Sequence, residues 1–83
     1  MTGRQRRNPP TLKQLELLLA LEKADGISSA GRALGMTASA TSHALRALES
    51  NVGVQLIDRN ASGVELTFAG KQVMPHVRDV FSA

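Results

Sequence analysis

One stretch of the sequence places short hydrogen-bonding side chains on a single side of a predicted helix. From about Ser39 to Val52, apolar residues recur with a helical period on one side. The opposite side carries Ser39, Ser42, His43, Arg46 and Ser50. Serine, histidine and arginine can approach base edges and phosphate oxygens closely, whereas a merely solvated face more often carries Glu, Lys and Gln. Taken alone, the pattern leaves a nucleic-acid-binding face and an ordinary solvated face open.

Two further helices are predicted ahead of this one, and they must hold it in place. Thr11 is a good N-cap for a first helix that runs to about Ala24. Ser28 or Ser29 starts a short second helix, which Gly35 ends. Because only a short turn then separates the second helix from the third, the pattern predicts a helix-turn-helix.

The first predicted helix has two apolar faces. Leu12, Leu15, Leu18 and Leu19 form one face, and Leu17 and Leu21 form the other. A surface helix with a single buried side would carry polar residues at Leu17 and Leu21. We therefore expect one face to lie in the core and the other to pack against another helix or a second subunit.

A hairpin of two short strands is predicted after the third helix. Residues 54–57 and 64–66 have strand character, and residues 60–63 between them have the composition of a turn. A two-stranded hairpin is not stable alone, so Leu56 and Leu66 are expected to point toward the helices.

A last helix follows, with Thr67 as its N-cap. Its apolar stripe consists of Ala69, Val73, Met74, Val77, Val80 and Phe81. The predicted fold is therefore mainly α: a winged helix-turn-helix of three helices and a two-stranded wing, followed by a linker or dimerisation helix.

The net charge of +3 is concentrated at the amino terminus. Arg4, Arg6 and Arg7 account for it, because residues 8–83 carry equal numbers of basic and acidic side chains. We expect residues 1–10 to form a flexible basic tail. An arm that touches phosphate and a simple solvating tail are both open interpretations of it.

The sequence lacks the residues that several kinds of chemistry require. There is no cysteine, and His43 and His76 lie on different predicted helices, so we expect no disulfide, no metal site and no cofactor. The sequence has no phosphate-cradling glycine loop and no suitably spaced carboxylate pair, which argues against an enzyme. No segment approaches the roughly 20 apolar residues of a membrane helix, and a cytoplasmic location is expected.

A set of residues spread from about Leu12 to Phe81 matches the pattern of one known family. They are Leu15 to Leu21, Ile27, Ala30, Leu34-Gly35, Ser42, Leu45, Leu48-Glu49, Gly53-Val54, Leu56-Ile57-Asp58-Arg59, Leu66-Thr67, Ala69-Gly70 and Pro75. With these residues the sequence resembles the LysR-type transcriptional regulators.

The resemblance implies a DNA-binding domain at residues 11–66 and the start of a dimerising linker helix at residues 67–83. In this family a sensing domain follows. It is absent here, so we expect the chain to be a fragment and any small-molecule effector to act only through that absent domain. The implied partners are double-stranded DNA, with a pseudo-palindromic operator, and a second copy of the chain.

The helix faces and the resemblance together give two sets of candidate site residues. The DNA-binding set is Ser28, Ser29, Thr37, Ser39, Ser42, His43, Arg46, Arg59 and Ser62. Within it, Ser39, Ser42, His43 and Arg46 are expected to face the major groove, and Ser28, Ser29 and Arg59 to hold phosphates. The dimer-interface set is Leu17, Leu21, Val73, Met74, Val77, Val80 and Phe81.

The sequence departs from the family pattern at four places. Gly31 stands where alanine is usual, Ala38-Ser39 replaces a common Gln-Pro, and His43 replaces a common arginine. Ser62-Gly63 stands where a basic residue is common near the wing tip. These departures remove a base-reading glutamine and put insertion of a wing arginine into the minor groove in doubt.

Two other functions stay open at this point. The neutral charge of residues 8–83 slightly favours a winged helix that only binds proteins or dimerises, without binding DNA. The molybdate-responsive regulators are a second alternative, because they have a similar domain.

Overall fold

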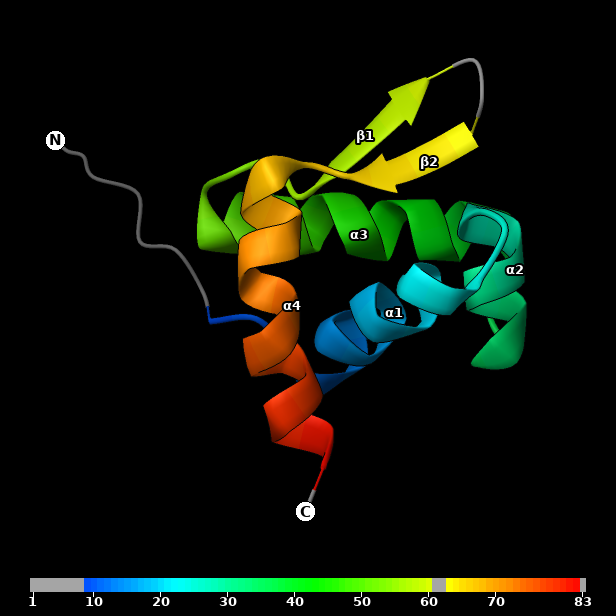
Figure 1. The fold of residues 1–83 in the computed structure, drawn as a ribbon. Helices are drawn as coiled ribbons and strands as arrows, with labels where there is room; N and C mark the ends of the chain where they lie inside the picture. The colour runs from blue at the N-terminus through cyan, green and yellow to red at the C-terminus, as the bar shows by residue number, and fades with distance from the viewer. Residues whose placement is uncertain (1–8, 61–62, 83) are drawn as a thin grey trace, which may run out of the picture.

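The computed structural model describes residues 9–60 and 63–82 as four helices and a two-stranded antiparallel sheet (Figure 1). In chain order these are α1 (Leu12–Lys23), α2 (Ile27–Ala33), α3 (Ala38–Val52), β1 (Ile57–Asn60), β2 (Gly63–Leu66) and α4 (Phe68–Phe81). The order confirms the predicted winged helix-turn-helix followed by a further helix. In Figure 1 the hairpin extends along one side of α3, while α1 and α2 lie on its other side.

A capping box fixes the start of α1 and ties it to the end of α3. The Thr11 hydroxyl accepts from the Gln14 amide at 3.1 Å, and the Gln14 side-chain oxygen accepts from the Thr11 amide at 3.0 Å. The same Gln14 oxygen accepts from the Asn51 side-chain amide at 3.2 Å. The predicted cap at Thr11 is confirmed, and its box also joins two helices.

The start of α2 differs from the prediction that Ser28 or Ser29 begins it. Gly26 is the N-cap, the helix begins at Ile27, and the cap makes no side-chain hydrogen bond. Both serines therefore lie in the first turn of α2. Gly26 has extended backbone, and its carbonyl accepts from the Ala30 amide at 3.1 Å, so the helix begins earlier than a serine cap would place it.

A very close approach joins α2 to α3. Thr41 is fully buried, and its hydroxyl donates to the Thr37 carbonyl at 2.7 Å. A Cβ atom added at Gly31 would overlap the Thr41 side chain. Gly31 thus departs from the family's usual alanine because α3 passes where that methyl group would stand.

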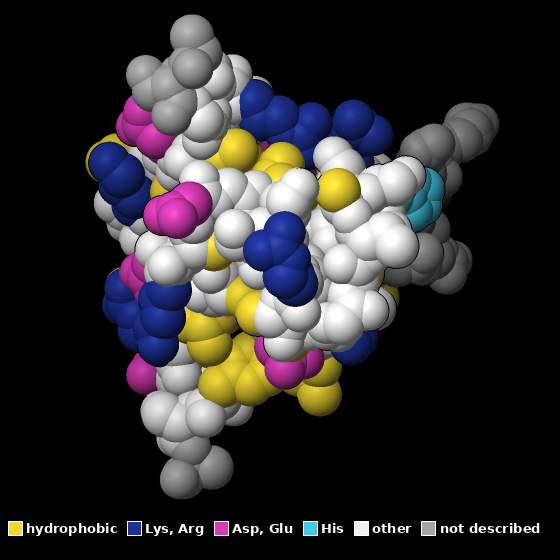
Figure 2. All heavy atoms as spheres, turned by 90° about the vertical axis from the view of Figure 1, so that its right-hand side faces the viewer, with side chains coloured by type: hydrophobic (Ala, Val, Ile, Leu, Met, Phe, Trp, Pro, Cys, Tyr) yellow, Lys and Arg dark blue, Asp and Glu magenta, His cyan; other side chains and the backbone are white. Residues whose placement is uncertain are grey.

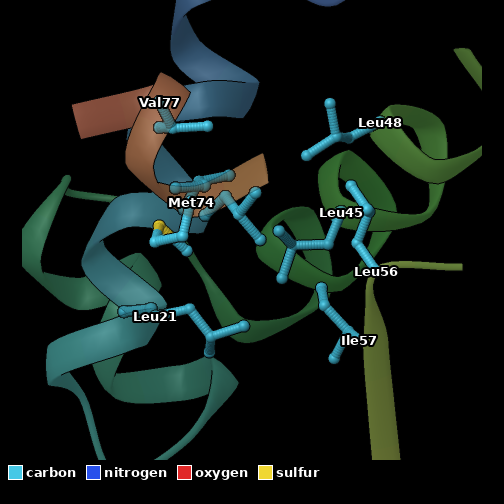
Figure 3. Close-up of a cluster of buried hydrophobic side chains, with 10 residues drawn as sticks. Leu21, Leu45, Leu48, Leu56, Ile57, Met74 and Val77 are labelled. Atoms are coloured by element: carbon cyan, nitrogen blue, oxygen red, sulfur yellow. The ribbon is translucent and has the colours of Figure 1, made fainter. Parts of the chain in front are cut away.

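The core is aliphatic and lies between the helices and the base of the wing. Figure 3 shows side chains from α1, α3, α4 and the β1 region converging on it. Its buried members are Leu17, Leu18, Leu21, Ala30, Leu45, Leu48, Leu56, Ile57, Met74 and Val77. Non-directional burial of these side chains is the main favourable contribution to stability.

The structure decides which of the two predicted partners covers the second apolar face of α1. Leu17 and Leu21 are buried in the chain's own core, whereas Leu12 is 65% exposed. Of the two predicted partners for the second face, another helix of the same chain is correct, because α1 packs against α2, α3 and α4.

The hairpin begins later than residue 54. Val54 is exposed, β1 starts at Ile57, and Ile57 pairs with Leu66 while Asn60 pairs with Gly63. Leu56 is buried as predicted, but it lies just before the strand rather than in it. The strand is shorter at this end because the Leu56 amide donates to the Glu49 carboxylate at 2.8 Å, so that only the Leu56 carbonyl is bonded across to the other strand, accepting from the Thr67 amide at 3.0 Å.

Two contacts join the start of α4 to the segment before β1. Thr67 caps α4, as predicted, by accepting from the Gly70 amide at 3.0 Å. Its hydroxyl also donates to the Gln55 carbonyl at 2.7 Å. A Cβ atom at Gly70 would overlap the Leu56 carbonyl oxygen, so α4 approaches this segment as closely as backbone allows.

The close approach of Gly31 to Thr41 makes alanine unfavourable at a helical position. Gly31→Ala should lower the free energy of unfolding by about 1–3 kcal/mol, because the new methyl overpacks the contact. Thr41→Ala removes the side-chain atoms that the new methyl would overlap, so the double variant should be less destabilised than the sum of the two single variants. Urea unfolding of both single variants and the double variant measures the coupling.

Gly26→Ser is the matched control for this experiment. An added Cβ there meets nothing within 4 Å, and the new hydroxyl can cap α2, so its stability should equal or exceed that of the parent chain. A Gly31→Ala variant more stable than the parent would contradict the steric explanation.

Candidate nucleic-acid interface

The outward face of α3 carries the polar residues that the sequence singled out. Thr37 caps this helix through its hydroxyl, which accepts from the Ala40 amide at 3.1 Å, and Gly53 ends it in the left-handed region. Thr41, Leu45 and Leu48 face the core. On the other side, Ser39, His43, Arg46 and Ser50 are exposed, and Ser42 is half-buried.

Glu49 fixes the wing to α3. One of its carboxylate oxygens accepts from the backbone amides of Leu56 and Ile57, at 2.8 and 2.9 Å. These amides lie where the chain enters β1, so the carboxylate sets where the hairpin begins on the helix.

In the sequence, Glu49 was identified only as one of the residues that carry the family resemblance. One signal was present: an acidic residue in the last turn of α3 is unfavourable next to the negative end of the helix dipole. An acidic residue at this position therefore indicates a specific partner. In the structure that partner is the backbone at Leu56 and Ile57, where the wing begins.

The wing brings a second arginine to the outward face of α3. Arg59 lies on β1 opposite Val64, and its guanidinium donates to the Ser42 hydroxyl at 3.1 Å. Arg46 and Arg59 line one groove of about 280 Å³ between α3 and β1. The remaining lining residues of that groove are Glu49, Gln55, Ile57 and Asp58. Two predicted DNA-binding arginines, distant in sequence, are thus brought together.

Neither arginine is neutralised by a neighbouring carboxylate in the described part of the chain. Within residues 9–60 and 63–82, the one ion pair joins Arg78 to Glu22. Glu49 and Asp58 line the same groove as the two arginines, but neither carboxylate forms an ion pair with Arg46 or Arg59.

Charge is also distributed unevenly over the surface. Figure 2 shows a group of Lys and Arg side chains along the upper edge of the face in view, while toward its left and lower parts further Lys and Arg side chains lie among the Asp and Glu side chains. The zero net charge of residues 8–83 therefore conceals a local group of basic side chains.

The remaining members of the predicted DNA-binding set lie in other surroundings. Ser28 is exposed, and half-buried Ser29 lines a separate groove between α1 and α2 with Lys23 and Asp25. Thr37 is exposed, and its hydroxyl caps α3. Ser62 and the basic residues of the tail lie outside the described residues.

The predicted dimer-interface set divides into buried and exposed members. Leu17, Leu21, Met74 and Val77 are buried in the chain's own core, and Val73 is partly buried against it. The expectation that these buried side chains meet a second subunit is wrong, because α4 folds against α1 of the same chain and covers them.

At the end of α4 the stripe emerges from the core. Val80 is 51% exposed and Phe81 38% exposed, so these two members of the predicted set are available to a second subunit. Nearby, the ion pair of Arg78 with Glu22 holds this part of α4 against α1.

Two kinds of feature are absent from the described residues. Residues 9–60 and 63–82 contain no helix that combines the length and the apolar character needed to cross a membrane. They also contain no group of three or more His, Cys, Asp or Glu side chains placed to hold a metal ion.

Comparison with known proteins gives a consistent picture. The sequence profile of bacterial regulatory helix-turn-helix proteins of the lysR family matches residues 12–71. A curated relative, the probable hydrogen peroxide-inducible genes activator of Mycobacterium xenopi, is 43% identical over 74 residues. That alignment covers 89% of this chain and 39% of the relative, so the chain spans about two fifths of that protein's length.

Solved structures of similar proteins include two complexes with DNA. DarR of Vibrio fischeri in complex with DNA is 36% identical, with a TM-score of 0.79, over 84% of this chain and 24% of that one. The DNA-binding domain of CbnR in its DNA complex is 28% identical, with a TM-score of 0.78, over 84% and 80% of the two chains.

The bonds of Glu49 to the wing backbone generate a test. Glu49→Ala leaves the Leu56 and Ile57 amides without this acceptor, and should lower the free energy of unfolding by about 1–3 kcal/mol. Hydrogen exchange at these two amides should also become faster.

Glu49→Gln is the matched control, because its side-chain oxygen still accepts from both amides. It should lose clearly less stability than Glu49→Ala. Equal losses in the two variants, with unchanged exchange at Leu56 and Ile57, would show that the carboxylate does not fix the wing.

Proposed function

Because the chain belongs to the lysR family of bacterial regulatory helix-turn-helix proteins, we propose that it binds specific sequences in double-stranded DNA as a dimer and so regulates transcription. One observation carries the proposal: the exposed, hydrogen-bonding face of α3 lies beside a wing that adds Arg59 to Arg46, and neither arginine is paired with a described carboxylate. Residues 11–66 are the DNA-binding domain, and residues 67–83 begin a linker helix. The match to the lysR family also favours this assignment over a molybdate-type regulator.

In this proposal α3 lies in the major groove as the recognition helix. Ser39, His43 and Arg46 face base edges, and arginine there suits guanine, whose O6 and N7 accept two bonds from one guanidinium. Arg59 contacts phosphate, as do Ser28 and Ser29 at the start of α2. Thr37 is a proposed DNA contact as well, because its hydroxyl accepts from the Ala40 amide and keeps its own proton to donate, and Ser62 is a further proposed contact.

The DNA complexes of DarR and of the CbnR DNA-binding domain support double-stranded DNA as the partner. The curated relatives carry names of transcriptional regulators or activators, so we propose a regulatory role without enzymatic activity. The DNA of a bacterium lies in its cytoplasm, which is the location we propose.

We assign dimerisation to the exposed end of α4. Two-fold symmetry places the two recognition helices on successive major grooves, about 34 Å or a multiple of that apart, and matches a pseudo-palindromic operator. A small-molecule effector is proposed to act on parts of the full-length protein outside this domain, since the Mycobacterium xenopi relative is more than twice as long as the matched region.

Loss of side chains from the recognition helix tests the groove assignment. With an operator selected from a random DNA pool, Arg46→Ala and His43→Ala should each weaken binding by about 1–3 kcal/mol and change the preferred base at one position. Lys13→Ala removes a positive charge from α1 and should leave base preference unchanged. Unchanged operator affinity in both α3 variants would remove this helix from recognition.

The salt dependence of binding separates DNA binding from a protein-interaction role. Log affinity for DNA must fall steeply against log salt concentration, because several phosphates release counterions. The affinity of an apolar protein interface would change little with salt concentration.

Aspartates at the end of α4 test dimerisation. The parent chain should sediment as a dimer, and the variant carrying Val80→Asp and Phe81→Asp as a folded monomer with strongly reduced operator affinity, because each half-site is then bound separately. Phe68→Asp is the matched control, since Phe68 is 78% exposed at the other end of the helix. A parent chain that stays monomeric at high micromolar concentration contradicts the proposal.

A further inference from the structure

The register of the wing directs one arginine toward α3. Side chains alternate along a strand, so Ile57 and Arg59, two residues apart, point to the same face of β1. Ile57 is buried in the core against the helices, and Arg59, one step nearer the wing tip, therefore extends over α3. Its guanidinium ends on the Ser42 hydroxyl at 3.1 Å.

Three residues of α3 spaced at i, i+4 and i+7 face the hairpin. Glu49 accepts from the backbone at the base of the hairpin, and Arg46 lines the groove between α3 and β1. Ser42, nearer the start of α3, contacts Arg59. Ser42 is correspondingly half-buried, unlike the exposed Ser39 and His43 on the same helix. The hydroxyl of Ser42 thus faces the wing, and the predicted groove-facing set divides into two groups.

Arg59 keeps most of its binding capacity in this position. A guanidinium has five N–H donors, and the Ser42 hydroxyl is the one acceptor that Arg59 contacts in the described part of the chain. Since that acceptor is neutral, the charge of Arg59 remains available to an anion. A long side chain held at one point also loses less conformational entropy on binding.

We propose that Ser42 is a positioning residue rather than a base-reading one. It holds the Arg59 guanidinium beside Arg46, so that the wing and the recognition helix engage DNA together, with Arg59 on a phosphate. The proposal rests on the DNA-binding function proposed above, and it assigns to Ser42 an action exerted through Arg59.

A double-mutant cycle between Ser42 and Arg59 tests this role. The chains compared are the parent, Ser42→Ala, Arg59→Ala and the double variant, each titrated with the selected operator and with an unrelated duplex of equal length. Ser42→Thr keeps the hydroxyl and serves as the conservative variant. Ser39→Ala, alone and with Arg59→Ala, is the matched control on the exposed side of α3.

Ser42→Ala should weaken binding to both duplexes by a similar factor, about three- to tenfold, without altering base preference. In the Arg59→Ala background the same change should have no further effect, and Ser42→Thr should restore most of the affinity. Arg59→Ala should make the negative slope of log affinity against log salt shallower by about 0.9, the value for one phosphate contact. The effects of Ser39→Ala and Arg59→Ala should add.

Two results would overturn the positioning role. One is an equal loss from Ser42→Ala with and without Arg59, and the other is a changed base preference in Ser42→Ala, because either means that Ser42 contacts DNA by itself. These results leave DNA binding intact. If the parent chain shows no salt-dependent binding to any duplex, the proposed function fails and the role of Ser42 fails with it.

Discussion

The carboxylate of Glu49 is the contact on which the geometry of this domain depends. A two-stranded hairpin has little stability of its own, and burial of Leu56 and Ile57 holds it to the core without defining its direction. The two hydrogen bonds from the start of β1 to Glu49 are directional. They fix where the hairpin begins on α3, and the strand register then fixes that Arg59 reaches Ser42.

Close approach of backbone is the second condition for this arrangement. Gly31 lets α3 pass directly over α2, and Gly70 lets α4 rest on the carbonyl of Leu56. In an aliphatic core with little aromatic bulk, such contacts bring short side chains within reach of one another. The same segment that Glu49 holds from α3 is therefore held from α4 as well, through Thr67.

The electrostatics of the candidate interface follow from how the acidic groups are used. Glu49 is bonded to backbone amides, Glu65 accepts from the Asn60 side chain, and Glu22 pairs with Arg78. Among the described residues no carboxylate forms an ion pair with Arg46 or Arg59, so both guanidinium groups stay available although residues 8–83 have no net charge. Net charge is thus a poor guide to function here, because binding depends on which charges remain unpaired at one place.

The sequence by itself determined most of the helix boundaries, which depend on local signals; the start of α2 at Ile27 is the exception. Helical periodicity, the caps at Thr11 and Thr67 and the stop at Gly53 are set within a few residues along the chain, and the structure has them where the patterns predicted. The outward face of α3 was predictable for the same reason, since a helix fixes which side chains share a side.

Only the tertiary structure decided which apolar faces are covered and which polar groups meet. Amphipathicity shows that Leu17, Leu21 and Val77 must be buried, but it does not say whether the cover is the same chain or another one. The contact of Arg59 with Ser42 spans 17 residues of sequence, so no local pattern records it. Such contacts depend on how the elements pack in space, and packing is decided by the sum of many weak, non-directional contacts rather than by any one motif.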